Sequence, residues 1–212
     1  MKLVCISDTH GLHDELTIPE GDVLIHAGDF SRSGKTKELI EFNAFLLAQP
    51  HRHKIVIAGN HDWCFERDRN ASEALLSAAV YLQDSSVDIE GVQFYGSPWQ
   101  PRFFDWAFNL DRGEPLKQVW SRIPQNTDVL ITHGPPLGIG DEVKDGYEVG
   151  CEDLLNAIER VQPKVHIFGH IHEGYGTYTR AYAQKSTTFI NACNLDERYQ
   201  VVNAPIVIEV EV

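Results

Sequence analysis

Five short polar motifs carry side chains of the kinds that bind metal ions. Asp8 and His10 stand two apart in S-D-T-H-G, and His170 and His172 have the same spacing in G-H-I-H. The segments A-G-D, G-N-H-D and T-H-G-P-P contribute one side chain each. Carboxylate, amide and imidazole groups together suit divalent transition metals, whereas a calcium site would be built from oxygen atoms alone. The predicted ligands are Asp8, His10, Asp29, Asn60, His133, His170 and His172.

This ligand set indicates two metal ions that share one bridging carboxylate. Manganese is the preferred prediction, and iron, zinc or nickel also suit such nitrogen and oxygen donors. No cysteine accompanies the motifs, which argues against a structural zinc site. A single D-x-H or G-N-H arises often by chance, so the prediction depends on the five motifs occurring together at similar places along the chain.

Apolar runs rich in Val and Ile lead into each motif, as expected of buried strands that end in loops. If the strand geometry persists, Asp8 and His10 project to the same side. Helical patterns lie between the strands, and the alternation favours βαβ units with ligands gathered beyond the carboxyl ends of the strands. The predicted helices cover residues 35–49, 71–82, 114–123 and 151–163.

Three further apolar segments, 87–97, 186–194 and 204–212, have no helix of comparable length between them and look like antiparallel strands. A mixed α/β sandwich of two sheets is therefore favoured over a simple doubly wound sheet. A chain of 212 residues suits one domain, and no linker or repeat divides it, so the predicted domain is 1–212.

The charge balance disfavours long polyanions as partners. The net charge is −13 with a pI of about 5.1, which repels DNA and RNA, although bound cations would make a cleft locally positive. Four scattered cysteines without a C-x-x-C pair and an N-terminus without a signal-like apolar region predict a cytoplasmic protein. No apolar stretch approaches the roughly 20 residues of a membrane span, so no membrane partner is expected.

The order D-x-H, G-D, G-N-H-D, a single His and G-H-x-H resembles the signature of the calcineurin-like metallophosphoesterases. The resemblance implies a four-layer α/β/β/α sandwich with two mixed β-sheets flanked by helices, and a bridging role for Asp29. The segments GDVLIHAGDF and YGSPWQP resemble more narrowly the small metallophosphoesterase-domain-containing subgroup, which is associated with cyclic-nucleotide phosphodiester hydrolysis. The resemblance implies that one metal is held by Asp8, His10, Asp29 and His172, and the other by Asp29, Asn60, His133 and His170.

The expected reaction is hydrolysis of small phosphodiesters, such as cyclic or other nucleotides, and also of monoesters, by attack of a metal-bridging hydroxide. His61 is predicted to donate a proton to the leaving group, and Asp62 is a candidate to orient it. Many relatives place an orienting carboxylate three residues after the bridging Asp, where this chain has Arg32. The orienting partner therefore stays open, and Arg32 becomes a candidate ligand for a substrate phosphate.

Other polar and aromatic residues are weaker candidates. His13 could line the rim of the cleft, and Trp99 begins an aromatic stretch, 99–106, that could stack on a base or pack in the core. Buried histidines inside apolar strands are expected to be hydrogen-bonded core residues, and two amides in N-A-C-N are expected to hydrogen-bond near the site. These are His26, His166, Asn191 and Asn194.

Two other functions compete with a small-molecule phosphoesterase. A protein phosphatase or nuclease would use the same motifs, but the chain leaves little room for a polymer-binding domain. A catalytically inactive scaffold for protein partners would keep the fold, since fold alone does not establish activity. The sequence pattern leaves the native metal, the physiological substrate and the oligomeric state open.

Overall fold

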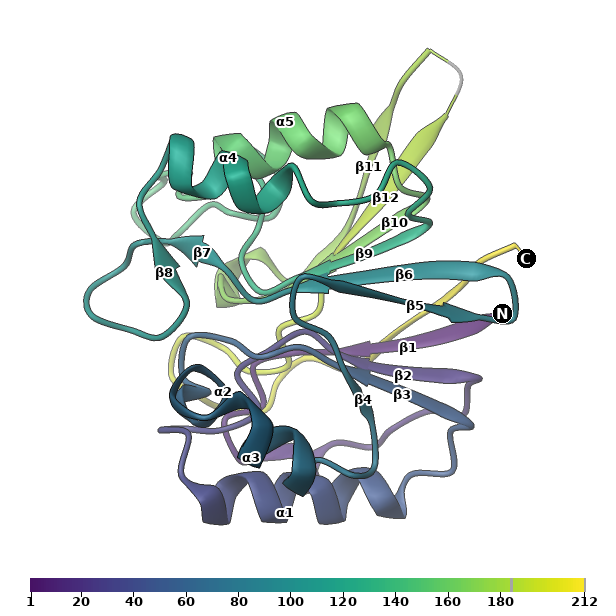
Figure 1. Cartoon of the computed structure of the whole chain (residues 1–212), viewed down its shortest axis with the longest axis vertical. Helices are drawn as coiled ribbons and strands as arrows, with labels where there is room; N and C mark the ends of the chain where they lie inside the picture. Colours follow the sequence, from purple (N-terminus) through teal and green to yellow (C-terminus); the bar gives the residue numbers. More distant parts are fainter. Residues whose placement is uncertain (184, 212) are drawn as a thin grey trace.

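Two mixed β-sheets lie face to face between layers of helices in the computed structural model, which describes residues 1–183 and 185–211 (Figure 1). The four-layer arrangement predicted for the chain is confirmed. The first sheet has β1–β4 parallel and β13 antiparallel to β1. Its order is β13 (Ile206–Glu209), β1 (Lys2–Ile6), β2 (Val23–His26), β3 (His53–Val56) and β4 (Val80–Tyr81).

The second sheet has four parallel strands with an antiparallel strand at each edge. The segment 87–97, expected to be an antiparallel strand, forms most of a hairpin in which β5 and β6 pair antiparallel. In contrast, β12 runs parallel to β10, because the chain reverses once into β11 and again into β12. The order is β11 (Gly176–Ala181), β12 (Ser186–Asn191), β10 (Val165–Phe168), β9 (Val129–Thr132), β6 (Val92–Ser97) and β5 (Ser85–Ile89). A short ribbon pairs β7 (Gln100–Pro101) with β8 (Asn109–Leu110).

Helices cover the outer faces of both sheets (Figure 1). The first sheet is covered by α1 (Thr36–Ala48), α2 (Trp63–Arg67) and α3 (Arg69–Leu75), and the second by α4 (Glu114–Trp120) and α5 (Glu152–Val161). Two 3-10 turns, η1 (His13–Glu15) and η2 (His172–Gly174), lie in loops. Among the described residues no helix combines the length and the apolar character that a bilayer crossing requires.

The helix predicted over 71–82 is wrong beyond Leu75, because the following residues form the edge strand β4. Tyr81 packs against Phe65 on the helix side of the sheet, with ring centroids 3.9 Å apart. Leu82 lies in the core between the sheets. Adjacent residues that pack on opposite faces require extended backbone, which outweighs the local preference for helix.

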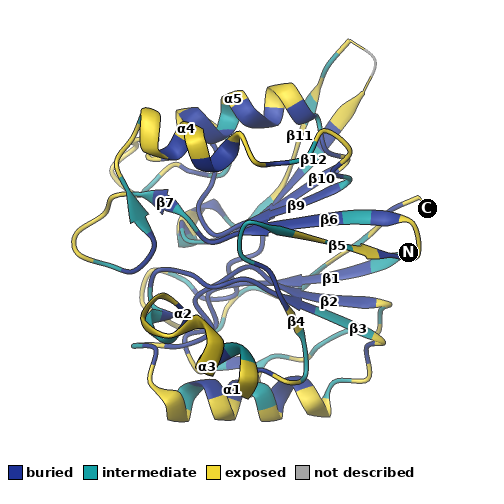
Figure 2. Cartoon of the chain, in the orientation of Figure 1, coloured by how far each residue is buried: buried dark blue, intermediate teal, exposed yellow. Residues whose placement is uncertain are grey.

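The central strands are buried on both faces (Figure 2). In β1, Leu3 and Cys5 face the core between the two sheets, and Val4 and Ile6 pack against the helices. This alternation fixes the register of each strand, because a shift by one residue would exchange its two faces. The carboxyl ends of the central strands are thereby held in place beside one another, and the five motifs follow those ends.

Candidate metal centre

The five motifs begin where β1, β2, β3, β9 and β10 end, as predicted, and they bring residues from both sheets to one site. Backbone hydrogen bonds join their loops. The N–H groups of Asp8 and His10 donate to the carbonyl oxygens of Gly28 and Asp29, each at 3.0 Å. In the second sheet, the N–H of Gly169 donates to the carbonyl of His133 at 2.9 Å. The loops therefore hold one another at the positions from which the side chains converge.

The strand geometry that would place Asp8 and His10 on the same side does not persist through the motif. Both residues have left-handed backbone, with φ of 54° and 43°, and so do Asp29 at 56° and His170 at 69°. Such a conformation costs a non-glycine residue about 1–3 kcal/mol and persists only where the surroundings enforce it. Turns, and not the alternation of a strand, therefore direct these side chains into the site.

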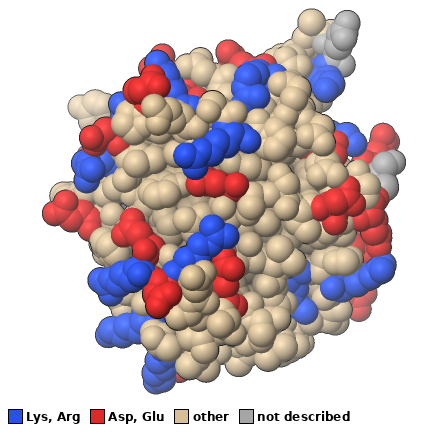
Figure 3. Space-filling view, in the orientation of Figure 1, with Lys and Arg blue, Asp and Glu red and all other residues tan. Residues whose placement is uncertain are grey.

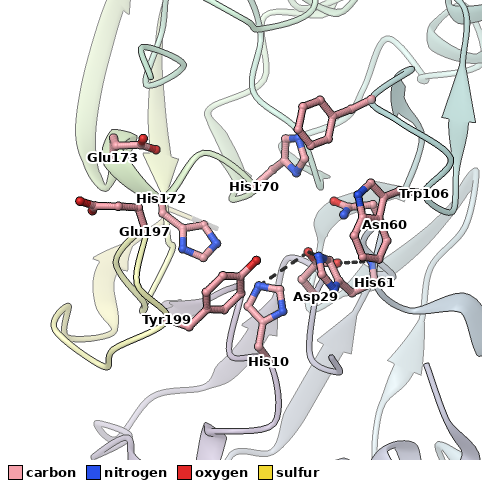
Figure 4. A pocket seen from close by; sticks show the side chains of 11 residues that line it. His10, Asp29, Asn60, His61, Trp106, His170, His172, Glu173, Glu197 and Tyr199 are labelled. Carbon is pink, nitrogen blue, oxygen red and sulfur yellow. Dashed lines mark hydrogen bonds and ion pairs between the residues drawn. The ribbon is translucent and has the colours of Figure 1, made fainter. Parts of the chain in front are cut away.

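The carboxylates of Asp8 and Asp29 each face several imidazole rings, and Figure 4 shows Asp29 among these rings. Asp29 Oδ2 is 3.8 Å from His10 Nε2 and 3.5 Å from His133 Nε2. Asp8 Oδ1 is 4.0 Å from His10 Nε2 and 3.7 Å from His172 Nε2. These separations exceed an ordinary hydrogen bond, so the atoms face one another without direct bonding. Within the described residues, groups able to hold an ion are Asp8, His10 and His172; His10, Asp29 and His61; and Asp8, Asp29 and His133.

Backbone carbonyl groups orient three of the histidines. His133 Nδ1 lies 3.0 Å from the carbonyl oxygen of Ala27, and His172 Nδ1 lies 2.8 Å from that of Asp196. A carbonyl oxygen only accepts, so Nδ1 carries a proton, and Nε2 would present its lone pair to a bound ion. Metal-binding histidines are commonly oriented in this way. The third, His61, is oriented by another carbonyl group described below.

Several buried polar atoms lack the partner that a cation would provide. Asp8 Oδ1 and both ring nitrogens of His10 make no hydrogen bond within the described part of the chain. His133 Nε2 and Asn60 Oδ1 lie 2.9 Å apart, close enough to share one ion. Buried polar atoms without partners are costly. The donor set therefore fits bound divalent cations.

The charge balance of the site leads to the same conclusion. Burial lowers the pKa of His133 and His172, but the neighbouring Asp29 and Asp8 carboxylates outweigh it and raise each pKa to about 9. Burial likewise raises the pKa of Asp8 and Asp29, but these histidines outweigh it and hold both values well below the usual range. The carboxylates thus attract positive charge into a buried site, and metal ions would supply it.

The Asp8 carboxylate is fixed by its neighbours. Asp8 Oδ2 accepts hydrogen bonds from the Ser7 hydroxyl at 2.6 Å, the His170 N–H at 2.9 Å and the Cys193 thiol at 3.1 Å. The two amides predicted to act near the site do so: Asn194 Oδ1 accepts from the Ser7 N–H at 3.2 Å, and Asn191 donates to the Ile171 carbonyl at 2.8 Å.

Asp62 supports Asp29 and does not orient His61, which corrects the sequence-based expectation. Its buried carboxylate accepts the N–H groups of Asp29 and Gly59, both at 2.8 Å. It also accepts from the N–H and the hydroxyl of Ser31, at 3.0 and 2.7 Å. The ring of His61 is instead oriented through Nδ1, 2.8 Å from the carbonyl oxygen of Arg32.

A pocket of about 290 Å³ opens onto the centre (Figure 4). Five of its lining residues were absent from the predicted site. Trp106 stacks on His61 with ring centroids 4.1 Å apart, and the hydroxyl of Tyr199 is directed into the pocket. Trp106 belongs to the aromatic stretch noted in the sequence, but no motif marks Tyr199. The lining residues are His10, Asp29, Asn60, His61, His170 and His172, joined by Phe103, Trp106, Glu173, Glu197 and Tyr199.

None of the three residues predicted to bind substrate lines this pocket. Arg32 Nε donates to the His10 carbonyl at 2.9 Å, which supports the loop. His13 is buried beside two phenylalanine rings, with centroid distances of 5.4 and 4.8 Å. The indole N–H of Trp99 donates to Asp84 at 2.9 Å, away from the metal centre. Each of the three has a structural role that its sequence context did not distinguish from substrate binding.

Comparisons with known proteins agree with this geometry. The model of the calcineurin-like phosphoesterase family matches residues 1–174. Metallophosphoesterase domain-containing protein 1 of Homo sapiens is 46% identical over 233 residues, which cover 98% of this chain and 70% of that protein. The UPF0046 protein K07C11.7 of Caenorhabditis elegans is 44% identical over 221 residues, covering 98% and 74%. The crystal structure of TT1561 of Thermus thermophilus superimposes with a TM-score of 0.63 at 14% identity, covering 93% and 94%, and supports the fold alone.

Proposed function

Because this chain belongs to the calcineurin-like phosphoesterase family, we propose that it hydrolyses small phosphodiesters with two divalent transition-metal ions bound around Asp29. The observation that carries the proposal is the position of Asp29. Its Oδ2 faces His10 on one side and His133 on the other, at 3.8 and 3.5 Å. A carboxylate that faces two histidines in this way is suited to bridge two metal ions.

Each ion takes ligands from both sheets in this proposal. Manganese is the preferred ion, with iron, zinc or nickel as alternatives that the same donors accept. Two such ions, when bound, polarise the phosphoryl oxygens and lower the pKa of water so that it can act as a nucleophile. One set of ligands is Asp8, His10, Asp29 and His172, and the other is Asp29, Asn60, His133 and His170.

His61 is proposed to hold a proton at Nε2 and donate it to the leaving oxygen. Its Nδ1–H is fixed on the Arg32 carbonyl, so Nε2 faces the site, 3.9 Å from Asp29 Oδ2. Trp106 stacks on the ring at an interplanar angle of 27°, which holds its orientation and limits access of water from that side. A positioned histidine of this kind typically contributes about 10²–10⁴-fold to a rate.

Small esters, with cyclic or other nucleotides among them, are proposed as substrates, and monoesters are the second choice. The pocket of about 290 Å³ suits a small molecule. Acidic and basic side chains are intermingled on the face shown in Figure 3, and the net charge of −13 disfavours a long nucleic acid. The four cysteines are all unpaired, which supports a proposed location in the reducing cytoplasm.

Metal analysis combined with ester hydrolysis tests the proposal. Manganese-loaded protein should hold about two ions per chain and hydrolyse bis-p-nitrophenyl phosphate faster than p-nitrophenyl phosphate. Asp29→Asn should lose at least one ion and most of the turnover, whereas exposed Asp14→Asn serves as the matched control. A loaded wild-type protein without bound ions and without activity on either ester would contradict the proposal.

A further inference from the structure

A second cavity, of about 470 Å³, adjoins the metal pocket. Phe103, His170 and Glu173 line both cavities, so the two share a border at a predicted metal ligand. The volume lies within the range of small-molecule sites, about 300–1,000 Å³. An ester whose phosphate lies at the metals can therefore extend one substituent into this space.

The wall of the second cavity is largely apolar. It is formed by residues that follow β7, β9 and β10 and by the loop before α5. At Gly134, next to the ligand His133, an added Cβ would meet no neighbouring atom closer than the Gln100 Cβ at 3.7 Å, so the wall is open there. The apolar members are Pro101, Phe103, Pro135, Val143, Val149 and Ile171.

Phe103 is held at the border although half of its side chain is exposed. Asn109 Oδ1 accepts the Phe103 N–H at 3.2 Å, and Asn109 Nδ2 donates to the Phe103 and Phe104 carbonyl groups at 3.3 and 2.9 Å. The Phe103 ring lies 6.2 Å from the ring of His170 and is 51% exposed. An aromatic ring that is carried on backbone held in this way and is left open to solvent offers a surface on which a flat group can pack.

Another part of the wall, at Val149 and Gly150, is also held in place. Arg112 donates to the carbonyl oxygens of Val149 and Gly150, both at 2.7 Å, and so holds this part of the loop in place. Val149 lines the cavity beside Arg112, whose guanidinium is engaged by these two carbonyl oxygens. A largely apolar cavity whose lining backbone is held at two places favours a rigid apolar occupant, because little ordering is required on binding.

We propose that the cavity between Phe103 and Val149 binds a ring-sized apolar substituent of a phosphoester whose phosphate lies at the metal centre. The inference rests on the proposed function and narrows the substrates to aryl or heteroaryl phosphoesters. Esters with small alkyl substituents leave the cavity empty and bind more weakly.

Calorimetric binding of two non-hydrolysable ligands to the manganese-loaded protein tests the inference. Phenylphosphonate should bind about tenfold more tightly than methylphosphonate, since burying a ring removes apolar area from water. Phe103→Ala and Val149→Asn should each reduce this ratio to about twofold or less. Two matched controls should preserve it: Phe104→Ala at the adjacent, 75% exposed ring, and Val207→Asn, because Val207 and Val149 are both 37% exposed.

Equal affinity of the wild-type protein for the two phosphonates would overturn the assignment while leaving the phosphoesterase function intact. A preference that survives both Phe103→Ala and Val149→Asn would also overturn it. If Val149→Asn does not fold, the exposed Phe103 provides the decisive variant. Failure to bind either phosphonate, together with no hydrolysis of any ester, would overturn the proposed function and the cavity assignment together.

Discussion

The Nδ1–H of His61 donates a hydrogen bond to the carbonyl oxygen of Arg32, with the two atoms 2.8 Å apart. The sequence left the partner that orients this histidine open, because the chain has an arginine at position 32, where many family members have a carboxylate. The backbone supplies the acceptor, so the identity of the side chain at this position does not determine the orientation of the ring.

His61→Asn should lower kcat for bis-p-nitrophenyl phosphate by about 10²–10⁴-fold, because the proton donor to the leaving oxygen is lost. The bound manganese should stay at the wild-type level, since His61 is not among the proposed ligands. Arg32→Ala keeps the carbonyl oxygen that accepts from the ring, so its kcat should remain close to the wild-type value. Steady-state kinetics and metal analysis of both variants test these expectations. A loss of kcat in Arg32→Ala as large as that in His61→Asn would contradict the role assigned to the backbone carbonyl.

Removal of the metal should lower thermal stability, because ions that bind only the folded state stabilise it. Manganese at 100 times its dissociation constant contributes about 2.7 kcal/mol, which corresponds to a rise in Tm of about 5–10 °C for a chain of this size. Differential scanning fluorimetry with and without a chelator measures the difference. Asp29→Asn should abolish most of the shift, and a shift of wild-type size in that variant would count against Asp29 as a shared ligand.

Gly169→Ala should reduce manganese binding, because a Cβ at this position would overlap Asp8 Oδ2 and the Ser7 hydroxyl. The overpacking should also destabilise the protein by about 1–3 kcal/mol. Gly134→Ala is the matched control, since this glycine also adjoins a ligand but its Cβ would meet nothing nearer than 3.7 Å. Metal stoichiometry and urea unfolding of both variants provide the measurement; equal metal content in the two would show that the contact is not required.

Acid should destabilise the metal-free protein partly through His166. Its Nε2 pairs with the Thr132 hydroxyl at 2.8 Å, Nδ1 has no partner within the described residues, and burial lowers the pKa from 6.5 to about 3. The unfolded chain therefore binds more protons between these values, and stability falls as the pH drops below about 6.5. Between pH 7.5 and 5.5 this histidine should account for about 1.4 kcal/mol.

Urea unfolding at both pH values, with chelator present, measures the effect of His166. The variant His166→Asn should lose about 1.4 kcal/mol of the difference between the two pH values. Thr132→Val, which keeps the histidine, should lower the free energy of unfolding by a similar amount at both pH values. If the difference in the free energy of unfolding between the two pH values is the same in His166→Asn as in the wild-type protein, the role assigned to His166 is wrong.

Tyr199→Phe should raise KM for a phosphoester several-fold with little change in kcat, because the hydroxyl that points into the pocket would be lost without disturbing the ring beside His10 (Figure 4). Kinetics on the manganese-loaded variant would test this. Tyr178→Phe, which changes a hydroxyl outside the metal pocket that donates to the Gly174 carbonyl, is a suitable control. Identical KM values for Tyr199→Phe and the wild-type protein would exclude a substrate contact.

The sequence by itself determined the order of the motifs, the types of the predicted ligands and the two-sheet fold. Apolar runs buried on both faces mark the central strands, and a polar cluster after each run, such as that at Asp29, marks its carboxyl end. These signals are local in the chain, so they are readable from residue types and spacing. The segment at 80–82 was misassigned because Tyr81 and Leu82 pack on opposite faces of a sheet that the local pattern does not reveal.

Only the tertiary structure decided which groups support the predicted ligands and which face the pocket. Contacts between segments distant in sequence determine three features of the site. These are the use of the Arg32 carbonyl as an acceptor, the left-handed turns at Asp8 and His10, and the position of Tyr199. Backbone acceptors are present at every residue, so no sequence pattern distinguishes the one that orients a histidine. Long-range packing selects it, and the same packing directs Asp62 to Asp29 instead of to His61.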